Sequence, residues 1–425
     1  MPLSAFGVFV GLFSSAFAQE ICEEPDKSNF LDGEHFWIQW DEDVGTEESA
    51  SEFLTYAEEA RSFYIDELDW PFTDQSILMT VESTSFSGGL AQTLACGDNI
   101  VPSITLYATA VGKPGLITTK HEVAHAAQYA YMGDYLSSVN SWTWWMEGCA
   151  SWMATHASDD ASDWAVDVSA YLERPWLPLH QTVAAYIDDD RVGHMYGTAV
   201  LAQFIEDNYG IDTVRQTWEV GAAYSGETID FRDIITELGI DWEDFWRQYM
   251  ATMTVVDVTH ADTLASGLPA EREVTSFPAS GNPAEHSRPR GLGLSGVHFG
   301  ANALGKGTLT VTFEGDPAVE WYAQLVVVVG PSLQGEVVEI LPIELVDGAG
   351  EIALEVDGKH TEHMWLIASP QSVEDEGYDY AWSADLPQKD EEKGGCGCSS
   401  TLVPVSSGTL LLLAPLWWRR RRVAA

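Results

Sequence analysis

The chain is poor in basic side chains. Lysine and arginine together number 20 of 425 residues, against 66 aspartates and glutamates, which gives a formal net charge of −46. Nucleic-acid phosphates are bound by clustered lysine and arginine, so this composition excludes a nucleic-acid partner. Acidic runs such as Asp188-Asp189-Asp190 and Asp159-Asp160 are best interpreted as solvated surface, as in proteins from salty environments. Divalent-cation binding is the alternative for each run.

Cysteine is also scarce and unevenly placed, with five residues in the chain. In an oxidising compartment Cys22 and Cys96 could form a disulfide, although the sequence does not settle the pairing. Cys149 is expected to be a buried thiol that packs as a small apolar group. The other two, Cys396 and Cys398, belong to a separate motif near the C-terminus.

The N-terminus lacks the basic residues that usually open a signal peptide. It does contain an apolar run from Ala5 to Leu12, and Ala16-Phe17-Ala18 matches the A-x-A pattern of a cleavage site. Residues 1–18 are therefore predicted to be a signal peptide, with the mature chain beginning near Gln19. We expect the protein to be exported.

The C-terminal tail carries three features in order. Gly394-Gly395-Cys396-Gly397-Cys398 follows an acidic linker, an apolar stretch runs from Thr401 to Trp418, and Arg419 to Arg422 form a basic cluster. The apolar stretch is about the minimum length that can span a bilayer, and the arginines would stay on the cytoplasmic side. This order resembles the MYXO-CTERM class of bacterial C-terminal sorting signals.

That resemblance implies recognition by a sorting protease, removal of the helix, and display at the cell surface through a modified Cys396 or Cys398. A plain single-pass membrane anchor is the alternative. Pro404 and Pro415 make the helix imperfect, which suits a transient anchor better than a permanent one. The membrane is therefore expected as a partner before processing, and the product is anchored at the cell surface or outer membrane, or released.

The most informative pattern in the chain is His121-Glu122-Val123-Ala124-His125. On a helix, residues four apart lie on one face with Cβ atoms about 5–6 Å apart, so both imidazoles can bind one metal ion. Glu122 lies one step round the helix, where a carboxylate can act as a base on water. Alone this HExxH pattern is a weak signal, because it also arises by chance.

A catalytic zinc usually has three protein ligands and one open position, so a third ligand is expected. Glu147, in Trp144-Trp145-Met146-Glu147-Gly148-Cys149-Ala150, is the best candidate. HExxH followed by W-x-x-E-G-x-A resembles the gluzincin metallopeptidases, the group that contains thermolysin and the aminopeptidase-N-like enzymes. The resemblance implies that His121, His125 and Glu147 bind Zn²⁺ and that Glu122 is the general base.

Two features depart from the family pattern. The gap between the motifs, residues 126–146, is slightly longer than the commonest spacing, and the loop around Gly133 to Asn140 is expected to absorb the difference. The aminopeptidase branch carries a G-x-M-E-N motif that grips the substrate's free amine, and nothing between Thr84 and Pro114 matches it. An endopeptidase is therefore favoured over an exopeptidase.

A donor to the oxyanion of the tetrahedral intermediate is a further implication of the resemblance. The segment His194-Met195-Tyr196-Gly197-Thr198-Ala199 resembles the stretch where related enzymes keep a tyrosine or histidine for this role. Tyr196 is the family-like choice, whereas a Y-x-K-G spacing counted back from Gly197 selects His194. A tyrosine that only packs the start of a helix is the alternative.

The apolar pattern predicts an α+β chain. Strands are expected at 35–40, 77–81 and 102–108, with a helix at 47–67, an order that resembles a gluzincin catalytic domain with a small mixed sheet. In that family the strand nearest the zinc binds an extended substrate, which would place Ser103 to Tyr107 at the cleft. Later helices are expected at 151–177, 212–219, 230–238 and 241–250, the last three opened by an aspartate N-cap and the one at 230–238 closed by Gly239.

From about Leu268 the pattern changes to short β-rich runs separated by glycine and aspartate turns. The runs at 307–313, 324–329, 337–345, 351–356 and 363–368 predict a β-sandwich that binds substrate or cell wall, or acts as a spacer. His360 and His363 are expected on a turn, and a second metal site is not expected there without further ligands.

These observations predict a zinc-dependent endopeptidase of the bacterial cell surface that acts on a peptide or protein substrate. The alternative is a catalytically inactive surface binding or adhesion protein on the same scaffold, with the β-sandwich as its working part. The predicted parts are a signal peptide at 1–18, a zinc metallopeptidase domain at 19–262, a β-sandwich at 268–387, a linker and Gly/Cys sorting motif at 388–400, a transmembrane helix at 401–418 and a basic tail at 419–425.

Overall fold

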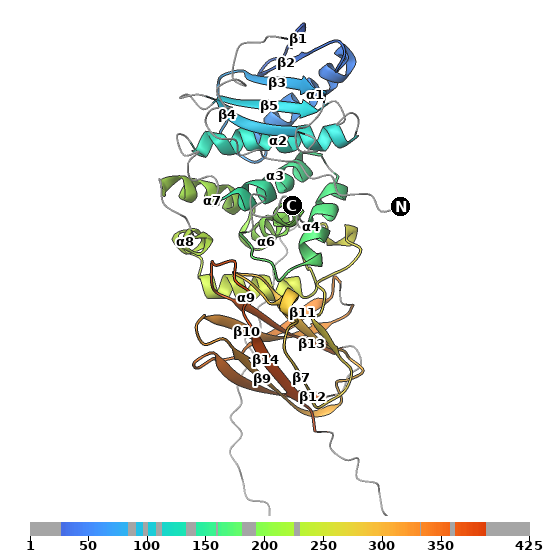
Figure 1. The fold of residues 1–425 in the computed structure, drawn as a ribbon, viewed down its shortest axis with the longest axis vertical. Coiled ribbons are helices and arrows are strands. Elements are labelled where there is room, and N and C mark those ends of the chain that lie inside the picture. Colours follow the sequence, from blue (N-terminus) through green and yellow to red (C-terminus); the bar gives the residue numbers. More distant parts are fainter. Residues whose placement is uncertain are drawn as a thin grey trace, which may run out of the picture. The chain divides into compact units, whose positions relative to one another are not determined.

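The structure of the chain is a computed structural model with a mixed α+β fold (Figure 1). It describes residues 27–83, 91–96, 101–107, 113–132, 142–158, 160–180, 193–224, 230–331, 333–357 and 362–387. Several sequence predictions lie outside these residues: the signal peptide, Cys22, the 133–140 loop, the 188–190 acidic run, and the linker, sorting motif, helix and basic tail after 387. Within the described ranges, no helix has the length and apolar character needed to cross a membrane.

A five-stranded sheet forms the first layer of the described chain. Its strand order is β1-β2-β3-β5-β4, in which β2, β3 and β5 run parallel and the two outer strands run antiparallel to their neighbours. The predicted strands at 35–40, 77–81 and 102–108 are confirmed, whereas the patterns do not predict β1 and β4. The bounds are β1 Asn29–Asp32, β2 Phe36–Trp40, β3 Ile77–Glu82, β4 Ala91–Cys96 and β5 Val101–Tyr107.

The expectation that an extended substrate adds as a strand to Ser103 to Tyr107 is wrong. This segment lies on β5, which pairs with β3 on one side and with β4 on the other, so both of its edges are occupied. A strand paired on both edges cannot accept an added strand. Among the described strands β4 is the edge strand beside helix α2, and none pairs with its outer edge.

Helix α1 (Glu47–Asp66) confirms the helix predicted at 47–67. It begins at a capping box in which Thr46 and Ser49 bond reciprocally to each other's backbone amides. Its buried residues recur at the three- and four-residue spacing of one helix face, so the helix lies with one side in the core. They are Ala50, Phe53, Ala57, Ala60 and Tyr64.

Helices α2 (Lys113–Met132) and α3 (Thr143–Ser158) carry the two sequence motifs and pack against each other. Helix α2 also lies along the sheet, against β4 and β5 (Figure 1). Helix α3 is buried continuously from Thr143 to Thr155, because other helices contact it on several sides. The motifs therefore lie in the most enclosed part of the helical layer.

The remaining helices confirm some of the predicted helix bounds and N-caps and contradict others. The single helix expected at 151–177 is two helices, since α3 ends at Ser158 and α4 begins at Ser162. Asp230 and Asp241 cap α8 and α9 as expected, but Gly210, with φ 96°, caps α7 in place of Asp212. The bounds are α4 Ser162–Glu173, α5 His194–Gly197, α6 Ala199–Tyr209, α7 Ile211–Ala223, α8 Phe231–Glu237 and α9 Trp242–Met253.

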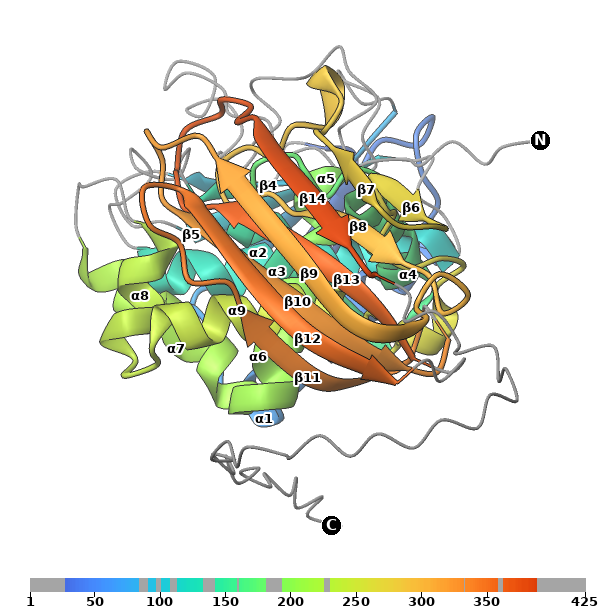
Figure 2. The same ribbon diagram turned by 90° about the horizontal axis from the view of Figure 1, so that it is seen from below.

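Two further sheets follow, one lying over the other (Figure 2). Their orders are β11-β10-β13-β8-β6 and β12-β9-β14-β7, and they share one apolar cluster to which Leu309 and Phe313 contribute from one sheet and Leu325 and Leu366 from the other. Each predicted β run lies on a strand, although β11 ends at Pro342, before the expected Leu345. The bounds are β6 Arg272–Val274, β7 Ala279–Gly281, β8 Ser295–Phe299, β9 Lys306–Gly315, β10 Trp321–Val329, β11 Glu336–Pro342, β12 Ala349–Asp357, β13 Glu362–Pro370 and β14 Tyr380–Asp385.

Strand β10 is buried on both of its faces. Leu325 and Val327 belong to the core between the two sheets, whereas Val326 and Val328 belong to the core of the helical layer. The indole nitrogen of Trp246 on α9 donates to Ser369 Oγ on β13 at 3.1 Å, across the same contact. The sandwich and the helical layer are therefore packed together, which explains the uninterrupted apolar run of β10.

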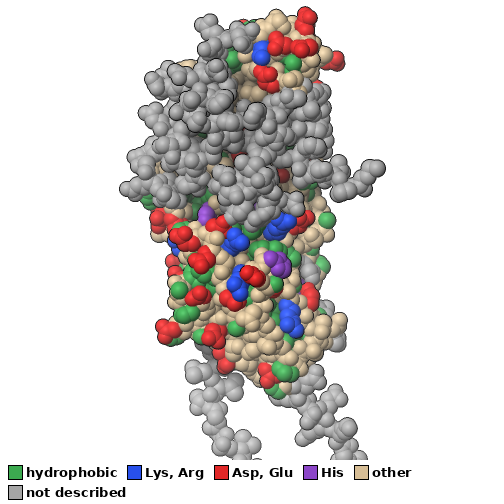
Figure 3. Space-filling view, in the orientation of Figure 1, with side chains coloured by type: hydrophobic (Ala, Val, Ile, Leu, Met, Phe, Trp, Pro, Cys, Tyr) green, Lys and Arg blue, Asp and Glu red, His purple; other side chains and the backbone are tan. Residues whose placement is uncertain are grey.

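On the face shown in Figure 3, carboxylates lie beside lysines and arginines. Some form ion pairs, such as Arg290 with Asp375 at 2.8 Å and Arg288 with Asp379 at 3.1 Å. Exposed pairs of this kind contribute little to stability.

Glu206 on α6 joins this helix to α3 through one partly buried carboxylate. Its Oε2 accepts from Trp152 Nε1 and Gln203 Nε2, both at 2.9 Å, and lies 2.9 Å from His156 Nε2. Burial alone would raise the pKa of Glu206, but the hydrogen bonds and the charge of His156 outweigh it and lower the pKa below its ordinary value.

We expect Glu206→Gln to lower the free energy of unfolding at pH 7 by about 1–3 kcal/mol, because bonds to a charged acceptor are lost. A carboxyl whose pKa is lowered in the folded state stabilises the fold above the unfolded pKa, and this contribution is lost as pH falls through the folded pKa. In urea unfolding, the difference in free energy of unfolding between wild type and Glu206→Gln should therefore become smaller as the pH is lowered towards 4. Glu351→Gln, on an exposed position of β12, is the control; a gap that does not change with pH would count against this account.

Candidate metal centre

The structure brings His121, His125 and Glu147 together, as the two motifs predict. Their ligand atoms all lie within 4.8 Å of one another. Glu147 Oε2 is 3.0 Å from His121 Nε2 and 3.6 Å from His125 Nε2. All three side chains are buried, so their polar atoms converge on a point shielded from solvent.

Local packing explains how the two helices reach this arrangement. Lys120 Nζ on α2 donates to the carbonyl oxygen of Ala157, in the last turn of α3, at 2.6 Å. Gly148 lets α3 approach the start of α6, because a Cβ there would lie 2.0 Å from Thr198 Oγ1. The glycine that follows Glu147 in the second motif is therefore required by helix packing.

Three buried polar atoms of the two motifs have no hydrogen-bond partner among the described residues: Glu122 Oε1, His125 Nε2 and Glu147 Oε1. Leaving such an atom unpaired costs about 1–3 kcal/mol, and more where it is charged. A bound cation would satisfy the atoms of His125 and Glu147. Two imidazoles and one carboxylate suit zinc and other divalent transition metals, so the residues present fit a metal ion.

The charges at the centre are strongly coupled. Burial would lower the pKa of His125, but the Glu147 carboxylate raises it to about 9. Burial would raise the pKa of Glu147, but His125 and His121 lower it below its ordinary value. Without a cation, a proton on His125 balances the Glu147 charge, and metal binding would replace that proton.

Glu122 lies beside these ligands and is held by β4. Thr93, fully buried on that strand, has its hydroxyl 2.6 Å from Glu122 Oε2 and 3.0 Å from the Glu122 carbonyl oxygen. Burial raises the pKa of Glu122 to about 7. Thr93 was not among the predicted site residues, because β4 was not predicted; its only sequence signal is a short run between a glycine pair and the HExxH helix.

Tyr196 and His194 have different surroundings, although both lie on the one-turn helix α5. The ring centroid of Tyr196 is 5.8 Å from that of His121. Burial raises the pKa of the Tyr196 hydroxyl well above its ordinary value, and the carboxylates of Glu147 and Glu122 raise it further. His194 instead stacks on Tyr171, with ring centroids 4.8 Å apart. Of the two predicted candidates, the structure therefore brings Tyr196 to the metal centre.

Two other predicted features have clear places. Cys149 is free and fully buried, as expected, and burial raises the pKa of its thiol to about 12.

His363 lies on β13 and not on a turn, with its Nδ1 2.8 Å from His298 Nε2, while His360 lies outside the described residues. His298 Nδ1 is 2.7 Å from Glu273 Oε2, and in the described ranges no three-ligand cluster forms there.

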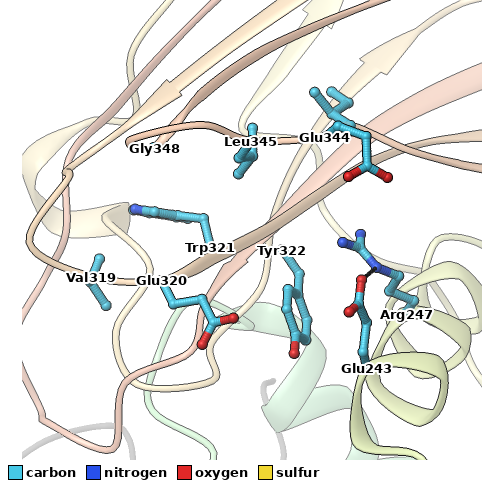
Figure 4. Close-up of a pocket in the computed structure, with 10 residues that line it drawn as sticks. Glu243, Arg247, Val319, Glu320, Trp321, Tyr322, Glu344, Leu345 and Gly348 are labelled. Atoms are coloured by element: carbon cyan, nitrogen blue, oxygen red, sulfur yellow. Dashed lines mark hydrogen bonds and ion pairs between the residues drawn. The ribbon is translucent and has the colours of Figure 1, made fainter.

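A separate pocket of about 230 Å³ lies between α9 and the sandwich (Figure 4). Arg247 pairs with Glu243 at 2.7 Å and lies over the Tyr322 ring, 4.7 Å from its centroid. Glu320 and Glu344 complete its charged lining. No residue of the metal centre lines this pocket, and its chemistry is that of an interface ion pair.

Comparison with known proteins gives a family match. The model of a family described as "Family of unknown function (DUF6055)" matches residues 26–258, which include both motifs. No curated protein matches the chain. A solved family GH115 4-O-methyl-alpha-glucuronidase, with specificity for decorated arabinogalactans, is 8% identical with a TM-score of 0.16; the match covers 73% of this chain and about half, 51%, of that one. A likeness this low carries no argument about fold or activity.

We expect the purified protein to bind one divalent metal ion per chain, measured by equilibrium dialysis with elemental analysis. Glu147→Gln should weaken binding by at least the roughly 10–100-fold that loss of an outer-shell partner costs. Metal at about 100 times its Kd should stabilise the wild type by about 2.7 kcal/mol, and a chelator should remove that gain. Glu59→Gln, on the exposed side of α1, is the matched control. Equal metal content in wild type and Glu147→Gln would show that Glu147 is not a ligand.

Proposed function

The chain belongs to the family of unknown function (DUF6055), and because that membership supplies no activity, we propose from the site itself that it is a zinc-dependent metallopeptidase. The observation that carries the proposal is the buried convergence of His121, His125 and Glu147 with Glu122 beside them. The order of mixed sheet, HExxH helix and third-ligand helix supports the resemblance to gluzincins. We further propose that the enzyme is exported and acts at the cell surface, as the terminal segments of the sequence suggest.

Glu122 is the proposed general base. Bound zinc would supply polarisation of the scissile carbonyl and a lowered pKa for water at its open position. Thr93 holds Glu122 Oε2, so Oε1, which has no partner among the described residues, is the oxygen available to water. Burial raises the pKa of Glu122 to about 7, which suits a group that takes a proton from water and returns it to the leaving amine.

Tyr196 is the proposed donor to the oxyanion. Its raised pKa keeps the hydroxyl protonated at neutral pH, so it can donate a hydrogen bond as negative charge develops on the carbonyl oxygen. Its ring lies against His121, on the ligand side of the centre. A preorganised donor in a dry site is typically worth several kcal/mol of transition-state stabilisation.

No described strand pairs with the outer edge of β4, and this supports a peptide substrate. Thr93 lies on this strand and contacts Glu122, so the edge runs past the proposed base. Backbone groups along an unpaired edge can hydrogen-bond an extended peptide as an added strand. An edge that continues past the base on both sides suits cleavage within a chain, so we propose an endopeptidase.

We expect Glu122→Gln to abolish peptide hydrolysis while zinc stays bound. The amide keeps the shape of the side chain but cannot accept the proton of water, and loss of general-base catalysis typically costs about 10²–10⁴-fold. Cleavage of a mixed peptide library, with and without chelator, measures the effect, and Glu59→Gln is again the control. Cleavage that survives in Glu122→Gln would rule out this mechanism. A wild type that holds zinc but cleaves nothing would support the inactive binding protein.

We expect Tyr196→Phe to lower kcat by about 10²–10³-fold with little change in KM, because the lost hydrogen bond forms mainly in the transition state. Zinc content should not change. Tyr249→Phe is the matched control, since this buried hydroxyl bonds only to Tyr171 Oη, at 3.1 Å, among the contacts described for it. A larger loss of kcat in His194→Gln than in Tyr196→Phe would assign the role to His194.

A further inference from the structure

We infer that Gln128 is a positioning residue for the metal centre: its side-chain amide sets the tautomer of His125 and ties α2 to the turn of α3 that carries Glu147. The inference rests on the proposed metal centre and adds to it a residue that neither motif contains. Gln128 lies one helical turn after His125 on α2 and is fully buried. It contacts groups on both helices.

Two hydrogen bonds define its position. Gln128 Oε1 lies 2.8 Å from His125 Nδ1, and Gln128 Nε2 donates to the carbonyl oxygen of Met146 at 3.0 Å. Met146 precedes Glu147 on α3, so the Gln128 side chain joins the ligand His125 on α2 to the residue beside the ligand Glu147 on α3.

The direction of the amide follows from the chemistry of its neighbours. A main-chain carbonyl can only accept, so the amide nitrogen must face Met146 and the amide oxygen must face His125. An amide oxygen also only accepts, so His125 Nδ1 must carry a proton. The lone pair available to a metal is then on Nε2, the atom that lies 3.6 Å from Glu147 Oε2 and has no hydrogen-bond partner among the described residues.

This arrangement leaves the lone pair of His125 Nε2 for a metal while Nδ1 stays bonded to Gln128. A metal held at Nε2 would leave the bond to Gln128 intact. Metal binding therefore requires no rotation of the ring and no new partner for Nδ1. Outer-shell partners that orient ligand imidazoles in this way typically contribute 10–100-fold to metal affinity.

The other imidazole has a weaker support of this kind. His121 Nδ1 lies 3.5 Å from Ser151 Oγ, at the limit of hydrogen bonding, and Ser151 in turn bonds to Asp167 on α4. This contact is longer than the 2.8 Å contact between Gln128 Oε1 and His125 Nδ1, so it orients its imidazole less firmly. The larger share of orientation at this centre therefore falls to Gln128.

The test compares Zn²⁺ affinities of the full-length protein by competition with a chelating dye. Gln128→Leu keeps the volume but removes both hydrogen bonds, and we expect its Kd for Zn²⁺ to rise about 10–100-fold. Gln128→Glu should recover most of the affinity, because a protonated carboxyl can donate to Met146 and accept from His125. Gln324→Leu is the matched control: Gln324 is also fully buried and donates to a main-chain carbonyl, that of Arg247, but touches no metal ligand.

Each outcome separates this inference from the proposed function. A wild type that binds no Zn²⁺ would overturn the metal centre itself. A wild type that binds Zn²⁺ no more tightly than Gln128→Leu would overturn the role of Gln128 and leave the centre intact. Should Gln128→Leu fail to fold, nitrogen-15 NMR of the zinc-loaded wild type decides: a proton on His125 Nδ1 supports the inference, and coordination through Nδ1 would overturn it.

Discussion

The contact between α2 and α3 is the constraint on which the rest of the structure depends. It brings the ligand atoms of two histidines on one helix and of a glutamate on the other within 4.8 Å of one another, and all three side chains are buried. Such an arrangement of buried polar atoms is unfavourable unless each finds a partner. The sheet above α2 and the helices around α3 supply the apolar packing that holds these groups in place.

The supporting contacts of this centre come from elements far apart in the chain. Thr93 reaches Glu122 from an edge strand, Tyr196 approaches His121 from a short helix, and Gln128 links His125 to α3. Each contacts a different group: Thr93 a carboxylate oxygen, Tyr196 the ring of a ligand histidine, and Gln128 an imidazole nitrogen. In the proposed mechanism the site would therefore separate the tasks of holding a cation, moving a proton and donating to developing charge.

The ligand set could be predicted because its signal is local. The four-residue spacing places His121 and His125 on one helix face, and the resemblance of the motif around Glu147 to gluzincins implied the third ligand. Thr93 and Gln128 could not be found in this way, since a short edge strand has no clear period and a buried glutamine is informative only once its neighbours are known. The prediction that Asp212 is the N-cap of α7 was wrong for a related reason. It rested on residue type alone, whereas the N-cap is Gly210, whose φ is positive.

Strand β10 contributes to two cores, and this determines whether the β-sandwich can be separated from the helical layer. Val326 and Val328 cover apolar surface of the helical layer, and Trp246 bonds across the same contact. The β-sandwich is therefore part of the packing of the helical layer and not a separate domain. The family match ends at residue 258, before the β-sandwich begins. A protein built from the matched segment alone would expose the inner face of α9, and would need another apolar surface, from its own chain or from a second molecule, to remain soluble.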